Sequence, residues 1–309
     1  MKRILIVGGS SMLGYKISSI SKNYEIYYTF YRNKIFSDKN NSIKINICDK
    51  MECEKIVELK PDVIINCAAL TNVDYCEKFK DEAYEVNVNG TKNLVEICNK
   101  INSKFVHISS DAIFSGNKGC FVEEDTPKAV NVYGKTKLES EKIASLVSNH
   151  LILRSSVIFG WIPLQYLTTR DKSIKKMNFA LWVIKNLYEG KKIFVVNDQF
   201  NTPTLVDNLA NNIIELIDKD LTGIFHVGGQ SCISRLDFSR KLAEEFGYPT
   251  NLIHPIKTKE LNQNALRATN SCLNCQKSLQ AGMKILKIDE GIKIMAKQIK
   301  IENPQLFNN

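Results

Sequence analysis

The fold can be inferred from one stretch, Lys2-Arg3-Ile4-Leu5-Ile6-Val7-Gly8-Gly9-Ser10-Ser11-Met12-Leu13-Gly14. Its first part, Lys2–Val7, is a continuous run rich in Ile, Leu and Val, which is typical of a buried parallel strand. A turn, Gly8–Gly14, and a helix-like segment, Tyr15–Ser21, follow. This order presents backbone N–H groups and a helix N-terminus to a pyrophosphate. We therefore expect a dinucleotide cofactor to lie against Gly8, Ser10, Ser11, Met12, Leu13 and Gly14.

The second strand-like segment, Tyr24–Thr29, bears on which dinucleotide is bound. A fold that uses NAD usually carries Asp or Glu at the end of this strand, to hold the ribose 2′-hydroxyl. Here the sequence is Tyr28-Thr29-Phe30-Tyr31-Arg32-Asn33, without an acidic residue. Arg32 is well placed to meet a 2′-phosphate, which favours NADPH, with NADH as the second choice. The alternative for Arg32 is a solvated loop residue.

Strand-like and helix-like patterns alternate through the first 160 residues. We expect strands over Ser42–Ile47, Asp62–Cys67, Lys104–Ile108 and Leu151–Phe159, and helices over Met51–Leu59, Asp81–Lys100 and Val132–Asn149. This alternation predicts an α/β protein with a Rossmann-like, doubly wound parallel sheet. Ligands bind at the carboxyl edge of such a sheet, where Ala68, Ala69 and Ser109-Ser110-Asp111 would lie.

The remainder of the chain predicts a smaller lobe interleaved with the first. Its expected elements are helices over Phe179–Tyr188, Leu205–Asp218, Ser234–Gly247 and Asp289–Ile299, and strands over Lys192–Val196 and Gly223–Val227. We expect residues 1–160 to bind the dinucleotide, segments near 192–227 to return to that domain, and residues 161–309 to be mainly a substrate-binding lobe. The basic segment Ile162–Lys176 is either a loop over the active-site mouth or an ordinary surface loop.

The expected chemistry lies in Tyr133-Gly134-Lys135-Thr136-Lys137. A tyrosine and a lysine four residues apart share one face of an α-helix. A lysine ammonium near the Tyr133 hydroxyl would lower its pKa, and such a tyrosine can exchange a proton with a ketone or an alcohol. The pattern also arises by chance in Lys-rich helices. Its position after Ser109-Ser110-Asp111 is what favours catalysis.

The composition is that of an ordinary globular protein. The chain has 309 residues with a formal net charge of +9, but its Lys residues are spread among Asn and Ile, and no basic run is interleaved with aromatics. Compositional bias therefore explains the charge better than nucleic-acid binding does, although a positive cleft for a phosphorylated ligand is compatible with it. No apolar run has the length of a membrane span, and the short apolar start does not resemble a signal peptide.

The cysteines and histidines show no metal pattern. Nine cysteines lie at irregular spacing, and Cys272-Leu273-Asn274-Cys275 is a single C-x-x-C without a second pair. We therefore expect no metal site, no disulfide framework and a reducing, cytoplasmic setting. The four histidines are isolated, and His107 and His226 fall in strand-like runs where a core position is expected.

Several motifs, in order, resemble those of the dTDP-4-dehydrorhamnose reductase family of extended short-chain dehydrogenases/reductases. After Gly8–Gly14 come Asn66-Cys67-Ala68-Ala69-Leu70-Thr71-Asn72-Val73-Asp74, like "NAAAYTAVD", and Asn87-Val88-Asn89-Gly90. Ser109-Ser110-Asp111-Ala112-Ile113-Phe114 is similar to "STDYVFD", and Asn131–Lys137 and Leu153–Gly160 follow. Asn197–Thr204 is similar to "DQxGxPT" and Arg267–Leu273 to "RPxxSxLD". The resemblance covers nearly the whole chain.

This resemblance implies roles for residues at the matching positions. Ser110 would orient a substrate carbonyl, Tyr133 would be the acid/base and Lys137 would tune it and hold the cofactor ribose. Asp49 would lie near the adenine and Arg32 at a 2′-phosphate. The residues expected in or near a sugar-nucleotide pocket are Asp111, Val157, Gln199, Thr204 and Arg267. The implied activity is NADPH-dependent reduction of a nucleotide-linked 4-keto-6-deoxy sugar, by a homodimer.

Departures from the family pattern leave two other functions open. Ser11 replaces a glycine, Val157 stands where family reductases often have Trp, and Asn201 replaces the glycine of "DQxGxPT". Ala268 replaces a proline, and Ser140 stands where glycine is usual. One alternative is a regulatory subunit like that of methionine adenosyltransferase, which keeps the fold as a binding partner. The other is a sugar-nucleotide epimerase, which would favour tightly held NAD.

Overall fold

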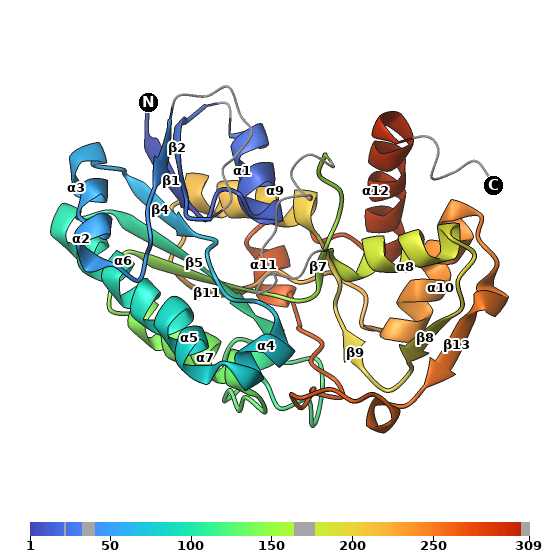
Figure 1. Ribbon diagram of the computed structural model, residues 1–309. Helices are drawn as coiled ribbons and strands as arrows, with labels where there is room; N and C mark the ends of the chain where they lie inside the picture. The colour runs from blue at the N-terminus through green and yellow to red at the C-terminus, as the bar shows by residue number, and fades with distance from the viewer. Residues whose placement is uncertain (22, 33–40, 164–176, 304–309) are drawn as a thin grey trace.

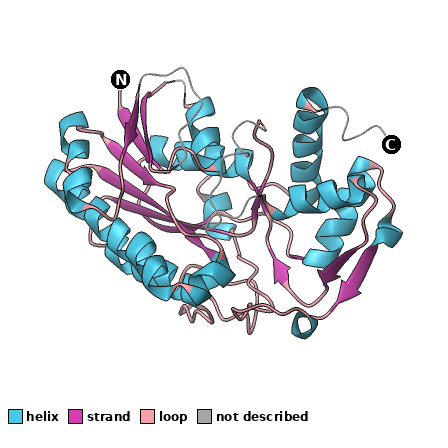
Figure 2. Ribbon diagram, viewed as in Figure 1, coloured by secondary structure: helices cyan, strands magenta, loops and turns pink. Residues whose placement is uncertain are grey.

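A parallel sheet of seven strands forms the centre of the computed structural model, which describes residues 1–21, 23–32, 41–163 and 177–303. The strand order is β3-β2-β1-β4-β5-β6-β11, and every neighbouring pair is parallel. Its strands are β1 (Arg3–Val7), β2 (Glu25–Phe30), β3 (Ser42–Lys44), β4 (Val63–Asn66), β5 (Lys104–Ser110), β6 (His150–Ser155) and β11 (Gly223–His226). The predicted doubly wound architecture is thereby confirmed (Figures 1 and 2).

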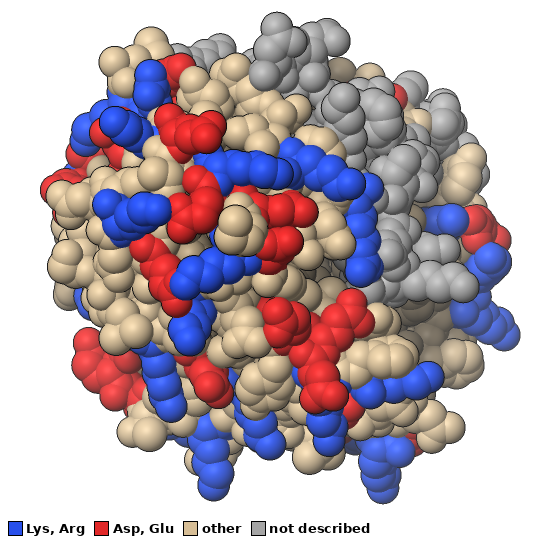
Figure 3. Space-filling view, turned by 60° about the vertical axis from the view of Figure 1, so that its left-hand side comes forward, with Lys and Arg blue, Asp and Glu red and all other residues tan. Residues whose placement is uncertain are grey.

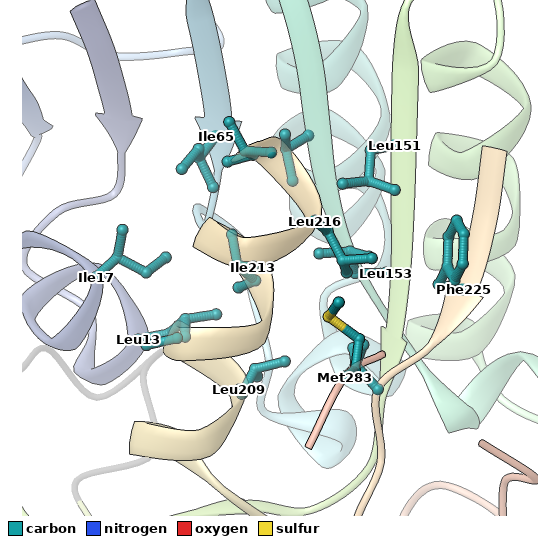
Figure 4. Packing of buried hydrophobic residues seen from close by; sticks show 14 of the residues in the cluster. Leu13, Ile17, Ile65, Leu151, Leu153, Leu209, Ile213, Leu216, Phe225 and Met283 are labelled. Atoms are coloured by element: carbon teal, nitrogen blue, oxygen red, sulfur yellow. The ribbon is translucent and has the colours of Figure 1, made fainter. Parts of the chain in front are cut away.

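Helices cover both faces of this sheet because alternate residues of its strands point to opposite sides. On one face lie α1 (Met12–Ile20) and α9 (Val206–Asp218). Figure 4 shows Leu13 and Ile17 of α1 with Leu209, Ile213 and Leu216 of α9 against Ile65, Leu151 and Leu153 of the strands. On the other face lie α3 (Lys55–Leu59), α6 (Gly90–Ile101) and α7 (Val132–Ala144).

The second part of the chain builds its own apolar core. Here lie α8 (Phe179–Tyr188), α10 (Arg235–Phe246) and α12 (Ile288–Glu302), with β8 (Ile193–Val196) paired in parallel to β13 (Ile253–Ile256). Of the residues near 192–227, β11 joins the large sheet whereas β8 belongs to this smaller one. We retain a boundary near residue 160 as a proposal. The expected loop Ile162–Lys176 falls, from residue 164 on, outside the described residues.

Short elements connect the two parts. They are β7 (Ile158–Phe159) with β10 (Thr204–Leu205), and β9 (Phe200–Asn201) with β12 (Ile233–Ser234). The predicted strand Leu151–Phe159 is therefore wrong as one element, because the chain turns at Val157, whose φ is +42°. A short helix η5 (Thr258–Glu260) and α11 (Gln276–Gln280) complete this region.

Two predicted helices are broken in the structure. Met51–Leu59 is split at Glu54 into α2 (Lys50–Cys53) and α3. Asp81–Lys100 becomes α5 (Lys80–Tyr84), a π-helical turn (Glu85–Asn89) and α6, and α4 (Val73–Lys78) precedes them. The π turn widens the helix where Asn87 turns inward, donating to Leu70 O and Thr136 Oγ1 and accepting from Leu70 N.

One disulfide joins Cys232, just before β12, to the buried Cys272. The expectation of unpaired cysteines is wrong at this pair. Forty residues separate the two cysteines, and only the approach of their two loops brings the sulfurs together. The bond places Cys272 with Cys232 rather than with Cys275 of the C-x-x-C pattern.

The surface mixes both signs of charge. On the face in Figure 3, Lys and Arg side chains lie among Asp and Glu side chains. Within the described part of the chain, no helix is long and apolar enough to cross a membrane. The same residues contain no group of three or more His, Cys, Asp or Glu arranged to hold a metal ion.

Candidate active site

The glycine turn between β1 and α1 is tied to the ends of two neighbouring strands. Gly8 N–H donates to Thr29 Oγ1 (3.2 Å) and Gly9 N–H to Thr29 O (2.9 Å). Gly8 has a φ of +74°, and a Cβ there would come within 2.9 Å of Ala68. The predicted cofactor residues Gly8 and Ala68 are thus in contact at the carboxyl edge of the sheet. A side chain at Gly8 would be strained by this φ and would collide with Ala68, so glycine is required at this turn.

Ser11, which stands where the family motif has glycine, caps the first turn of α1. It is the N-cap of α1, and its Oγ accepts a hydrogen bond from Gly14 N–H (3.0 Å). A serine cap satisfies one of the N–H groups left unpaired at a helix start. The turn therefore keeps the strand-turn-helix geometry with serine at this position.

Arg32 and Asp49 lie near the part of the sheet edge where an adenosine is expected. Arg32 follows β2, is half exposed and has a guanidinium nitrogen 3.9 Å from Glu82 Oε1. Asp49 is exposed and caps α2, with its Oδ1 accepting from Met51 N–H and Glu52 N–H. Their roles at the adenosine stay predictions.

Asp111 joins four segments that meet at the end of β5. Its carboxylate accepts hydrogen bonds from the hydroxyls of Ser110 (3.1 Å), Ser156 (2.7 Å) and Ser271 (2.6 Å), and from Asn201 Nδ2 (3.1 Å). Only 7% of Asp111 is exposed. The carboxylate therefore orients the Ser110 hydroxyl. Asn201, where the family motif has glycine, supplies one of these donors and also bonds Ser271 Oγ (2.9 Å).

A close approach of α7 to the end of β5 brings Tyr133 to Ser110. The first turn of α7 is capped by Asn131, whose Oδ1 accepts from Gly134 N–H (2.8 Å). A Cβ on Gly134 would lie 2.1 Å from Ala112 O, so only glycine permits this packing. The far end of α7 is held by a buried ion pair between Glu141 and Arg154 of β6 (2.9 Å).

The Tyr133 hydroxyl holds its proton strongly. Burial raises its pKa, the hydrogen bond with Ser110 opposes this rise, and the negative charge of Asp111 adds to it. The expected lowering of this pKa by Lys137 is wrong for this arrangement, because the Lys137 Nζ lies 3.1 Å from His107 Nε2 instead. A tyrosine with a raised pKa is a proton donor at neutral pH.

Lys137 is a buried cation with a depressed pKa. Only 2% of it is exposed, and burial lowers its pKa to about 8, against the opposing charges of Glu141 and Cys67. His107 is fully buried, as expected for a core residue, and its pKa is lowered well below the usual value by burial and by Lys137. The imidazole next to Lys137 is therefore neutral.

His107 connects Lys137 to the cofactor edge, a link that the isolated histidine did not signal in the sequence. Asn66 Oδ1 accepts from Ala68 N–H (3.1 Å), so the Asn66 amide nitrogen faces His107 Nδ1 (3.4 Å). On the other side, His107 Nε2 lies 2.9 Å from Ser140 Oγ, which donates to Lys137 O (2.8 Å). Ser140 thus completes a series of hydrogen bonds that a glycine, which lacks a side chain, could not form.

The expected substrate residues divide into two groups. Arg267 is an ion-pair partner of Asp74 (2.7 Å) at the edge of the site. Val157 lies at the strained turn after β6. By contrast, Gln199 Nε2 donates to Thr258 Oγ1 (3.0 Å), and the Thr204 hydroxyl is 1% exposed and donates to Ser156 O (2.7 Å). Gln199 Nε2 and the Thr204 hydroxyl thus bond within the protein.

The glycine turn on a parallel sheet, with a Ser-Tyr-Lys set at its carboxyl edge, defines the class of extended short-chain dehydrogenases/reductases. Within that class, the model of the RmlD substrate binding domain family matches residues 1–301. The chain belongs to this family.

Relatives agree with this assignment. The chain is 34% identical over 232 residues to a probable low-salt glycan biosynthesis reductase of Haloferax volcanii, covering 73% of this chain and 75% of the relative. It is 30% identical to a dTDP-4-dehydrorhamnose reductase of Aggregatibacter actinomycetemcomitans, covering 91% and 93%. It is also 27% identical to methionine adenosyltransferase 2 subunit beta of Bos taurus, covering 89% and 81%.

A solved structure of similar shape is a complex with NADP. The dTDP-4-dehydrorhamnose reductase of Bacillus anthracis, in complex with NADP, superposes with a TM-score of 0.84 at 27% identity. The match covers 96% of this chain and all of the other.

Proposed function

We propose that this protein is an NADPH-dependent reductase of a nucleotide-linked 4-keto-6-deoxy sugar, with dTDP-4-dehydrorhamnose as the first substrate to test. The observation that carries the proposal is the contact between Tyr133 and Ser110 at the carboxyl edge of the sheet. The family and the named activity of its reductase relatives give the substrate class.

The residues that would hold the cofactor fit a dinucleotide. Gly8 packs closely against Ala68 next to the N-terminus of α1, and Arg32 supplies a cation past β2. When bound, NADPH supplies the hydride for the ketone carbon. The chain itself supplies the binding turn, a protonated tyrosine and a buried cation.

Each side chain of the set has a defined task in the reduction. The Ser110 hydroxyl, which donates to Asp111 in the protein alone (3.1 Å), would turn its single proton to the ketone oxygen when the substrate binds. Tyr133 protonates that oxygen as it becomes an alcohol, because burial keeps its proton in place at neutral pH. Lys137, whose ammonium lies 3.1 Å from His107, would bind the cofactor ribose.

The test of this function is NADPH oxidation with enzymatically generated dTDP-4-dehydrorhamnose, with NADH in parallel. Tyr133→Phe removes the acid but keeps the ring, so the rate should fall by roughly a hundred- to ten-thousandfold. NADPH binding should persist in that variant. Normal turnover by Tyr133→Phe would refute the mechanism.

The regulatory-subunit alternative rests on the similarity to methionine adenosyltransferase 2 subunit beta. The proposal prefers the reductase because Ser110, Tyr133 and Lys137 are all present, with Ser110 and Tyr133 in contact at the edge of the sheet. Recovery of a stoichiometric synthetase with this protein, without NADPH oxidation on any keto sugar, would favour the alternative. A homodimer in the cytoplasm is the working assumption for these assays.

A further inference from the structure

Arg235 is a partly buried cation to which neither the sequence motifs nor the proposed mechanism gives a role. It is the first residue of α10, and its backbone N–H donates to Gln199 O (3.0 Å). Its guanidinium lies over the ring of Phe179, 4.8 Å from the centroid. Among the described residues, no ion pair or hydrogen bond reaches this guanidinium. A partly buried cation without such partners is costly, unless a ligand supplies the missing charge.

The position on α10 adds to this cost. The N-terminus of a helix carries a partial positive charge, so a cation in the first turn is unfavourable and an anion is favourable. Ser234 caps α10 through its hydrogen bond with Asp237 N–H (3.0 Å), which satisfies the local backbone without Arg235. The arginine therefore has no stabilising task at the helix start.

The electrostatic neighbours of Arg235 belong to the active site. They are the carboxylate of Asp111 and the guanidinium of Arg267. Asp111 already accepts four hydrogen bonds from other residues, and Arg267 is paired with Asp74. Two arginines thus lie close enough to repel each other, and the Arg235 guanidinium makes no ion pair or hydrogen bond with the described residues. Burial and this repulsion lower the pKa of Arg235 to about 10, despite the attraction of Asp111.

A disulfide joins the two segments that carry Arg235 and Arg267. The bond between Cys232 and Cys272 closes a segment that contains both arginines, with Arg235 three residues after one cysteine and Arg267 five before the other. The bond therefore links the start of α10, which carries Arg235, to the loop that follows Arg267.

We propose that Arg235 is a second anion-binding residue of the substrate site and that, with Arg267, it binds the diphosphate of the nucleotide-linked substrate. The inference rests on the proposed function for the identity of the substrate. A guanidinium fork matches phosphate oxygens, and a diphosphate supplies enough negative charge for two arginines. The stacking on Phe179 leaves the edge of the Arg235 guanidinium, where its N–H groups lie, for this contact.

The experiment measures binding without turnover, so that its result is independent of the keto sugar. Calorimetric titrations with dTDP, UDP and GDP identify the nucleoside diphosphate that binds most tightly to the intact protein. Its affinity is then compared in Arg235→Gln, in Arg235→Lys and in Arg240→Gln. Arg240 lies on the same helix but is exposed and pairs with Asp237 (3.6 Å), so its variant is a matched control for charge.

The proposal predicts that Arg235→Gln weakens the diphosphate about ten- to a hundredfold. Arg235→Lys should retain part of the affinity, and Arg240→Gln should retain all of it. NADPH affinity should not change in any variant. The melting temperature of Arg235→Gln should equal or exceed that of the parent, since an unpaired, partly buried charge is removed.

Three results would overturn the proposal. One is an unchanged diphosphate affinity in Arg235→Gln, and another is an equal loss of NADPH affinity in that variant. The third is that none of the three diphosphates binds. If binding depends on Arg235 but dTDP-4-dehydrorhamnose is not reduced, the proposed reaction fails and the anion site stands.

Discussion

Replacing Lys137 by Met should make the protein more stable while removing its activity. Met has a similar length and no charge, so it fills the same space between His107 and the cofactor edge. The pKa of the buried ammonium falls from 10.5 to about 8. Each pKa unit corresponds to about 1.4 kcal/mol, so the folded protein carries the charged lysine at a cost on the order of 3 kcal/mol. Lys137→Met removes this cost and also loses the contact between Lys137 and His107. The gain in the free energy of unfolding is therefore smaller than the full cost.

The pH dependence gives the sign of this effect. The pKa of Lys137 is lower in the folded than in the unfolded chain, so between about pH 8 and pH 10.5 the unfolded chain binds more protons. The stability contributed by this group therefore rises with pH through that window. Below pH 8 both states are protonated and the full cost applies. The stability advantage of Lys137→Met should be largest below pH 8 and should shrink toward pH 10.5.

The assay is urea unfolding of parent and variant at pH 7, 8, 9 and 10. Taking the difference between the two proteins cancels the titration of the other lysines and tyrosines. Lys135→Met is the control, because Lys135 is exposed on the same helix and should give a difference near zero at each pH. A Lys137→Met protein that is less stable than the parent at pH 7, or a difference that does not vary with pH, would refute the reasoning.

Two further predictions concern the bonds that hold the site together. Asp111→Asn should lower the free energy of unfolding by about 2 kcal/mol, because a neutral amide accepts weaker hydrogen bonds from Ser156 and Ser271. The same variant should turn over more slowly. An unfolding free energy equal to that of the parent would contradict this prediction. Cys232→Ser should lower the unfolding free energy by about 4 kcal/mol, the chain-entropy value for a 40-residue separation, or the melting temperature by about 6 °C. The exposed Cys120→Ser is its control, and an equal change in both variants would show that the disulfide is not the cause.

The architecture could be predicted from the sequence because its signals are local. The apolar run before Gly8 and the turn that follows depend only on neighbouring residues, and so does the alternation of strand and helix patterns. Helix limits were close for the same reason: the predicted Phe179–Tyr188 coincides with α8, which Asn178 caps. Boundaries failed at Val157 and within residues 81–100, where tertiary contacts impose a turn and a π turn.

The proposed membership of the candidate site rests on motifs in the sequence. Family motifs in order, each short, place Ser110, Tyr133 and Lys137 at the carboxyl edge of one sheet. The four-residue spacing, however, predicted Tyr133 as the partner of Lys137, whereas the structure places the Lys137 ammonium next to His107. Four residues along a helix bring two side chains to one face, but burial and the position of His107 decide where each group points.

Charge and pairing were decided only by the tertiary structure. The pKa of Tyr133 rises because the fold excludes water from its hydroxyl, a property that no neighbour in the sequence signals. The disulfide, the bonds to Asp111 and the partly buried guanidinium of Arg235 all join segments far apart in the chain. The sequence by itself determined the sheet, the glycine turn and the residue types at its edge, because those depend on local pattern. The protonation states and contacts of those residues depend on burial and on distant partners, which exist only after the chain has folded.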